Sequence, residues 1–558
     1  MKQMSISRSG KSAARRSFVW AAAWLVCGAG GAGAQHLPGT ARAASAERAA
    51  LRACDFQPLG ASTFAPPALA RIPGGSFAMG NSYSNLSPNE GWVHELPVHV
   101  VPVGEFYVGR FELTNEEMAR TLQWALTNGL VELDETYFVY TNGAGEVTNV
   151  VTNLCGTVRN VEGTAHELVD LDATYCQIAY TNGAFAVAAG KTNFPAIFVT
   201  WHGALAFCNY LSDRQGLARA VDFGPTNWSV DVSAEGYRLP TEAEWEKACR
   251  GGQPGTHFPW PDDSLQATNT YLYNVDVVKA NYWDGRYGAL SNNPAHPWFN
   301  ESIRTTPVGY YDGRQVVTNL TTNFLYLPGT IGADFGQTND MANGFGLYDM
   351  AGNVFEWCWD YHGTDWYANA AASLPDPTGP AAEASYHTQR VVRGGGFTYY
   401  IGVGISDPSF LRCSFHTSLP AEFSASYLGF RVARRPTAYE TWAETVGLDP
   451  LATNGVAEAD FDGDGQANGA EFVAQTQPTN PASFFKVASI GPVSNQAWLA
   501  YWGASGRVYA VEGATNWTRT NGWQTLLETT NWTTGTTQMC VEAPAEPRAL
   551  RIKARLAP

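Results

Sequence analysis

Residues 343 to 360 read NGFGLYDMAGNVFEWCWD, a glycine- and asparagine-rich turn that runs into a short aromatic segment. This stretch places the carboxylate of Glu356 among tryptophan, phenylalanine and methionine side chains. An unpaired carboxylate is costly to bury, so we expect either a metal ion or strong hydrogen bonds to backbone amides to compensate Glu356. The stretch therefore predicts a buried polar centre.

Helices are predicted at three places around this stretch. Thr114 with Glu117, and Thr241 with Glu244, have the spacing of a capping box, and Thr200 is a candidate cap for the helix that follows it. Short alternating runs between Gly, Pro and Asn turns predict strands elsewhere. Thr-Asn and Asn-Gly turns predict a hairpin-rich insertion over residues 131–192. The fold class is therefore α+β with little regular secondary structure.

Length and composition exclude several classes of protein. The chain has 558 residues, which exceeds one domain of about 150 residues and predicts roughly three or four units. With 45% hydrophobic and 15% charged residues it is not mainly disordered. A net charge of -16 without a long Lys/Arg run argues against nucleic acid or an anionic membrane as partner. No HExxH, P-loop, GxSxG or zinc-like Cys/His motif occurs.

The first residues have the pattern of a secretory signal. Residues 1–34 combine basic residues, a short apolar run and a small-residue site before Gln35, and residues 35–63 read as a leader. We expect export to the periplasm, the cell surface or the medium, with no transmembrane segment after cleavage. An exported chain can form disulfides, and Cys155 and Cys176 are candidates for a local bridge. The sequence leaves open the pairing of Cys54, Cys208, Cys358 and Cys540.

The composition changes near residue 436, and a calcium loop follows. Residues 460–471 read DFDGDGQANGAE, with Gly465 at the turn position of an EF-hand loop. The ligand positions hold Asp460, Asp462, Asp464, Gln466, Asn468 and Glu471. The alternative is an acidic turn without metal. A single loop predicts a structural calcium ion rather than a switch, in an EF-hand or half-dockerin unit over 437–481, followed by a small β-sandwich over 482–558.

Three segments taken together are more specific than any one alone. GYRLPTEAEWEKACRGG (236–252), the stretch quoted above, and RVVRGGGF (390–397) followed by LGFRVARR (428–435) resemble the formylglycine-generating enzyme, or sulfatase-modifying factor, family. The resemblance extends over a domain at 64–436, interrupted by the insertion. It implies a compact fold related to the C-type lectin fold, with low regular secondary structure.

Enzymes of this family oxidise a sulfatase cysteine to formylglycine with molecular oxygen and copper held by two thiolates, ligands that suit Cu(I). Here Tyr399 stands at the first cysteine position, no cysteine follows before Cys413, and Phe355 replaces a family tryptophan. We therefore expect no copper and a binding or scaffold protein for a peptide, protein or glycan. The alternative is an active formylglycine-generating oxidase. The candidate groove residues are Phe355, Phe397, Tyr399, Tyr400 and His416.

The resemblance also implies calcium and a disulfide. The ligands of one family calcium site map to the backbone carbonyls of Asp349, Gly352 and Val354 and to the side chain of Glu356. Asn281 matches the start of a second site. The family's structural bridge maps to Cys249 and Cys413. Cys208 matches a bridged family cysteine, but Val432 occupies its partner position, so Cys208 is either a buried thiol or is bridged differently.

Overall fold

The computed structural model describes most of the chain in separate segments. These are residues 3–7, 56–60, 64–82, 93–141, 147–173, 175–224, 228–260, 280–282, 305–315, 340–381, 389–397, 408–483, 485, 487–493, 496–514, 523–531, 534–542 and 549–556. They belong to two compact units, residues 1–435 and 436–558. Each unit is described by itself.

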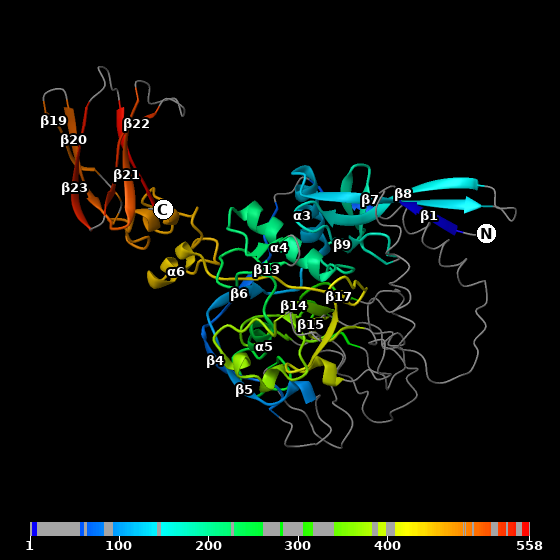
Figure 1. Cartoon of the computed structure of the whole chain (residues 1–558). Coiled ribbons are helices and arrows are strands. Elements are labelled where there is room, and N and C mark those ends of the chain that lie inside the picture. Colours follow the sequence, from blue (N-terminus) through cyan, green and yellow to red (C-terminus); the bar gives the residue numbers. More distant parts are fainter. Residues whose placement is uncertain are drawn as a thin grey trace. The chain divides into compact units, whose positions relative to one another are not determined.

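Several small sheets, rather than one large sheet, make up the first unit (Figure 1). The central one has the order β16 (His416–Pro420), β15 (Gln389–Arg393), β14 (Phe355–Tyr361), β17 (Leu428–Gly429). The others are β18 (Ala433–Arg434), β6 (Phe106–Gly109) and β3 (Leu69–Ile72); β4 (Gly75–Met79) with β5 (His99–Val103); and β12 (Val221–Asp222) with β13 (Ser229–Val230). Only β14 and β17 pair in parallel among these strands. Short 3-10 turns connect them: η1 (Val93–Glu95), η4 (Trp366–Ala368), η5 (Ala370–Ser373) and η6 (Pro408–Leu411).

Three helices of the first unit begin at the predicted caps. They are α3 (Asn115–Thr127), α4 (Trp201–Gln215) and α5 (Glu242–Cys249). Both capping boxes form. The hydroxyls of Thr114 and Thr241 each accept a hydrogen bond from the backbone amide of the glutamate three residues later, and the carboxylate of that glutamate accepts one from the backbone amide of the threonine. The hydroxyl of Thr200 likewise accepts a hydrogen bond from the amide of Gly203 and caps α4, but no carboxylate completes a capping box there. These local predictions are confirmed.

The described part of segment 131–192 is rich in antiparallel strand pairs. β7 (Val131–Thr141) pairs antiparallel with β8 (Val147–Asn160), which pairs in turn with β9 (Glu167–Asp170). β10 (Ile178–Thr181) and β11 (Ala184–Ala188) form a second hairpin, on which β2 (Phe56–Pro58) adds a strand. β1 (Gln3–Ser7), within the predicted signal segment, pairs with β7.

The core of the first unit is centred on α4. Every residue from Trp201 to Ser212 is buried, so neighbouring elements cover the helix on all sides. A glycine is needed at position 203, because a Cβ there would lie 2.0 Å from the carbonyl oxygen of Leu168. The indole of Trp201 donates to the carbonyl of Cys358 at 2.9 Å, which fixes β14 against the helix. This contact positions the buried side chains of β14, including Glu356.

The second unit joins a two-helix segment to a pair of sheets. α6 (Ala438–Thr445) and α7 (Asn468–Ala474) flank the acidic loop. The strands are β19 (Val487–Val493), β20 (Gln496–Gly503) and β23 (Gly535–Glu542) in one sheet, and β22 (Gln524–Asn531), β21 (Arg507–Ala514) and β24 (Ala549–Leu556) in the other. Arg507 donates to the carbonyls of Val473 at 2.7 Å and Phe472 at 3.2 Å, so α7 is attached to β21. A helix of seven residues is too short to be stable alone, so its contact with β21 helps to hold it.

Taken together, the described elements are a mixed α+β structure with little regular secondary structure, as predicted. Within the ranges given above, no helix has both the length and the apolar character that crossing a bilayer requires.

Candidate functional site

Glu356 is a fully buried carboxylate with a complete set of protein partners. Arg431 donates to both of its oxygens, from Nε and Nη2, at 2.6 Å each. The indole of Trp245 adds a third hydrogen bond at 2.7 Å. Charge-assisted, bidentate bonds of this kind are strong. The sequence required a metal or strong hydrogen bonds at Glu356, and the structure supplies hydrogen bonds from side chains rather than from backbone amides.

Two further carboxylates lie buried beside this pair. Glu112 accepts from the amide of Val354 at 3.1 Å and from Asn353 Nδ2 at 2.6 Å. Asp349 accepts from the amide of Gly309 at 2.6 Å. Burial, together with the charges of Asp349 and Glu356, raises the pKa of Glu112 well above its usual range. Burial also raises the pKa of Asp349 to about 6. Glu112 was missed from the sequence, where its only signal is a lone acid between Phe111 and Leu113.

The other positions of the family calcium sites meet in the same place. The amide of Gly352 donates to the carbonyl of Gly394 at 2.7 Å, and the amide of Asn353 donates to the carbonyl of Asn281 at 2.7 Å. Asn281 therefore lies against the turn that holds Gly352, Val354 and Glu356. Neither Asp349 nor Glu356 has a buried oxygen without a hydrogen-bond partner. Calcium at these positions stays a prediction. Glu356 itself does not require the ion, because side-chain hydrogen bonds already compensate its charge.

The acidic loop of the second unit is different, because its buried oxygens lack partners. Asp460, Asp462 and Asp464 each bring a carboxylate oxygen within 4.8 Å of the others. Asp462 Oδ2, Asp464 Oδ2 and Glu471 Oε2 are buried with no hydrogen-bond partner. Burial and the three aspartates raise the pKa of Glu471 to about 7. A cation at the centre of the loop would compensate all of these groups.

The side chains of two predicted ligands of this loop form hydrogen bonds with backbone groups. Asn468 donates to the carbonyls of Asn454 and Val456, both at 3.0 Å, and accepts from the amide of Phe461 at 3.1 Å. Gln466 Oε1 accepts from the amide of Phe485 at 3.2 Å. These positions of an EF-hand loop bind calcium through a backbone carbonyl and through water, so the arrangement still fits the ion.

The described cysteines of the first unit are buried. The Sγ atoms of Cys249 and Cys413 lie 3.2 Å apart as thiols, and the disulfide between them stays a prediction. Burial raises the pKa values of Cys208 and Cys358 well above the usual range of a thiol. The predicted bridge of Cys155 and Cys176 involves a side chain, that of Cys155, outside the described residues, and Cys54 lies outside them as well.

The predicted groove residues fall into two groups. Phe355, Phe397 and His416 are buried, with exposed fractions of 2%, 7% and 2%, and the two phenylalanines belong to the main hydrophobic core. Tyr399 and Tyr400 lie outside the described residues. Neither phenylalanine offers a ligand an exposed ring, because each packs against core side chains.

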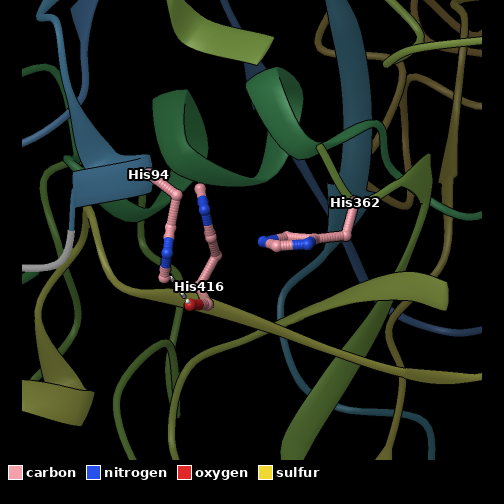
Figure 2. Close-up of side chains that lie close together, drawn as sticks. All are labelled: His94, His362 and His416. Carbon is pink, nitrogen blue, oxygen red and sulfur yellow. Dashed lines mark hydrogen bonds between the residues drawn. The ribbon is translucent and has the colours of Figure 1, made fainter. Parts of the chain in front are cut away.

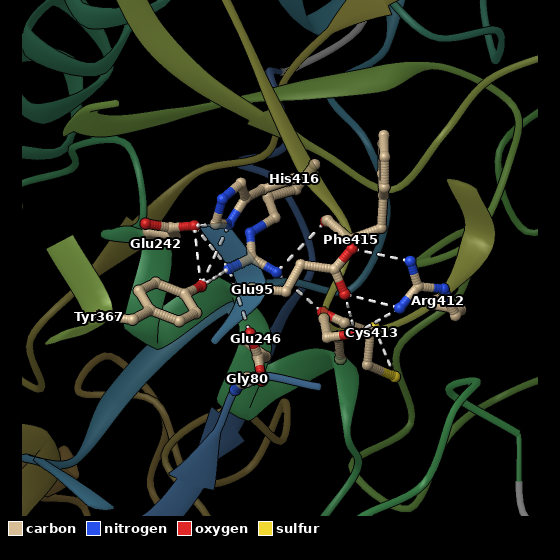
Figure 3. A network of polar contacts seen from close by, with 12 residues as sticks. Gly80, Glu95, Glu242, Glu246, Tyr367, Arg412, Cys413, Phe415 and His416 are labelled. Carbon is tan, nitrogen blue, oxygen red and sulfur yellow. Dashed lines mark hydrogen bonds and ion pairs between the residues drawn. The ribbon is translucent and has the colours of Figure 1, made fainter. Parts of the chain in front are cut away.

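His416 belongs to a buried network of charged groups (Figure 3). Its Nδ1 lies 2.5 Å from Glu242 Oε1, which also accepts from Arg393 at 2.7 Å. Burial alone would raise the pKa of Glu242, but the contacts of this carboxylate with His416 and Arg393 outweigh it and hold that pKa far below its usual range. A second ion pair belongs to the same network, in which Arg412 donates to both oxygens of Glu95 at 2.6 and 2.7 Å. Contacts between such distant residues were invisible in the sequence.

Comparison with known proteins relates this chain to a protein family. Residues 57–436 match the model of the sulfatase-modifying factor enzyme 1-like domain. The formylglycine-generating enzyme of Thermomonospora curvata is 26% identical over 373 residues, which cover 66% of this chain and 93% of that protein. The serine/threonine-protein kinase Pkn1 of Chlamydia trachomatis is 26% identical over 364 residues, 65% of this chain and 37% of the kinase. Among solved structures, PvdO from Pseudomonas aeruginosa is 21% identical with a TM-score of 0.36, over 66% of this chain and 95% of that one.

Proposed function

Because the chain belongs to the sulfatase-modifying factor family, we propose that it is an exported binding protein that keeps the family domain without a copper centre. One observation carries this proposal. Tyr399 occupies the first thiolate position of the resemblance, and no cysteine occurs between Gly394 and Arg412. Copper(I) bound by this family's chemistry needs two thiolates, so the residues present do not fit that ion.

Three buried cysteines of the first unit support the same proposal. Burial raises the pKa values of the Cys208, Cys249 and Cys358 thiols, which therefore stay protonated near neutral pH. The Sγ atoms of Cys249 and Cys413 lie 3.2 Å apart. Among the described residues, this pair is where a thiolate centre could form if the chain were an oxidase instead.

Turnover of a sulfatase-signature peptide tests the proposal. The purified full chain is incubated with the peptide, copper(I) and oxygen, and the loss of mass that accompanies conversion of cysteine to formylglycine is measured. We expect no conversion and no tight copper(I) binding. Conversion that the Cys413→Ser variant abolishes would establish the oxidase instead.

The proposed ligand is a peptide, protein or glycan that contacts Tyr399 and Tyr400. Paired aromatic side chains suit both peptide and sugar surfaces. Binding of the signature peptide and of a glycan array to the Tyr399→Ala and Tyr400→Ala variants tests this part. Trp502→Ala provides the matched control, because Trp502 is an aromatic residue of the second unit with 48% of its surface exposed. Loss of binding in the control alone would refute the assignment to the first unit.

We also propose that the loop 460–471 holds one structural calcium ion. The three buried oxygens without partners, on Asp462, Asp464 and Glu471, support this site. Calorimetric titration of the full chain should show binding that Glu471→Gln weakens about tenfold or more, because the loop loses its bidentate ligand. Asp449→Asn, which removes an exposed carboxylate of the same unit outside the loop, should leave the affinity unchanged. Equal affinities of all three proteins would show that the loop is an acidic turn without metal.

A further inference from the structure

Three histidines from distant parts of the chain converge beside the charged network. His94 lies in η1, His362 follows β14, and His416 begins β16. One ring nitrogen of each lies within 4.8 Å of the others. In Figure 2 the rings of His94 and His416 lie side by side, and the ring of His362 points toward them from the opposite side. The ring centroids of His94 and His416 are 4.5 Å apart, and each is 5.4 Å from that of His362.

Hydrogen bonds to His416 and His94 determine which ring nitrogen of each histidine keeps a lone pair that could bind a metal. Glu242 accepts at His416 Nδ1, so the lone pair of His416 falls on Nε2. That Nε2 is buried and has no hydrogen-bond partner. The carbonyl of His416 lies 3.2 Å from His94 Nε2, so His94 carries its lone pair on Nδ1. A carboxylate and a backbone carbonyl are the groups that usually orient metal-binding histidines from behind.

The carboxylate that orients His416 is itself held in place. Arg393 and Tyr367 hold the orienting Glu242 at 2.7 and 3.1 Å. Two buried side chains therefore fix the position of the carboxylate behind His416.

We propose that His94, His362 and His416 bind a divalent transition metal of the zinc type, with one coordination position left for water or an anionic ligand. Three imidazoles with an open fourth position are a frequent zinc arrangement, whereas calcium selects oxygen ligands. This site shares no residue with the acidic loop or with the thiolate positions that the family resemblance implies. It also does not depend on the proposed binding function.

A second histidine cluster of the first unit supplies the control. The rings of His166 and His202 stack with centroids 3.6 Å apart, and the third member, Glu422, is exposed. Within the described ranges, no carboxylate lies at hydrogen-bond distance from either ring, whereas Glu242 contacts His416. His202 is therefore a matched buried histidine outside the proposed site.

Cobalt(II) and zinc(II) titrations of the full chain test the proposal, with calcium present to fill oxygen sites and without a polyhistidine tag. We expect one equivalent of cobalt to give visible ligand-field bands without intense sulfur charge-transfer absorption, and zinc to displace it. The variants His94→Ala and His362→Ala should bind at least about tenfold more weakly, while His202→Ala should bind like the wild type. Glu242→Gln should weaken binding by about 10- to 100-fold, as loss of an orienting carboxylate does.

Three results would overturn the proposal. They are no cobalt bands in the wild type, unchanged binding in both His94→Ala and His362→Ala, and loss of binding in His202→Ala alone. His416→Ala is not relied on, because His416 also contacts Glu242 and its removal can disturb folding. His94 and His362 are only partly buried, so their variants should keep the wild-type circular dichroism spectrum.

Discussion

Replacing Arg431 by methionine should destabilise the first unit strongly. Arg431 is fully buried and is the cation that contacts Glu356. Its guanidinium also donates to the carbonyls of Gly109 at 2.9 Å and Tyr348 at 3.1 Å. Methionine fills a similar length without charge or donors. The variant would leave Glu356 buried with the indole of Trp245 as its remaining partner.

The size of the effect follows from the burial of this ion pair. Removing one partner of a buried pair costs about 3–5 kcal/mol, because the other charge remains without compensation. Glu112 and Asp349 add to the penalty, since both are buried carboxylates whose pKa values Arg431 lowers against the effect of burial. The double variant Glu356→Leu/Arg431→Met removes both charges and should therefore be less destabilised than Arg431→Met.

Urea unfolding followed by near-ultraviolet circular dichroism measures the effect. The transition of the second unit should not move and serves as an internal reference. Arg71→Met is the control, because Arg71 pairs with Glu105 at 2.7 Å but is 46% exposed, and such pairs contribute less than about 1 kcal/mol. If Arg431→Met costs no more than Arg71→Met, the reasoning is wrong. Recovery of the variant by calcium alone would show that a metal, and not Arg431, is the main compensation for Glu356.

Three other predictions concern separate features. Burial, with His166 and Arg390, lowers the pKa of His202 to about 3, so the unfolded chain binds its proton first and the free energy of unfolding falls as the pH drops below 6.5. His202→Gln lacks this term, and its destabilisation should shrink between pH 7.5 and pH 5 by about 1.4 kcal/mol per pH unit below 6.5; equal values from urea unfolding at both pH values would contradict this. Mass mapping without reductant should find Cys249 linked to Cys413, and alkylation of both thiols in the exported protein would disprove the bridge. N-terminal sequencing of exported protein should begin at Gln35, and an intact N-terminus would disprove cleavage after residue 34.

The sequence determined those features whose physics is local. Thr114 and Glu117, or Thr241 and Glu244, are three residues apart, so a single helical turn brings each pair together whatever the rest of the chain does. The acidic loop is local in the same sense, because twelve consecutive residues carry its oxygens and its glycine turn. The short hairpins of 131–192 follow from turn residues between alternating runs.

Tertiary structure alone decided the partners of the buried charged groups. Glu356 meets Arg431 across 75 positions, Asn353 meets Glu112 across 241, and His94 meets the carbonyl of His416 across 322. No periodicity or spacing in the sequence encodes such pairs, since they depend on which strands become neighbours. A carboxylate or imidazole that is removed from water needs a hydrogen-bond partner within the core. Which partner lies within reach depends on how the sheets and α4 pack together.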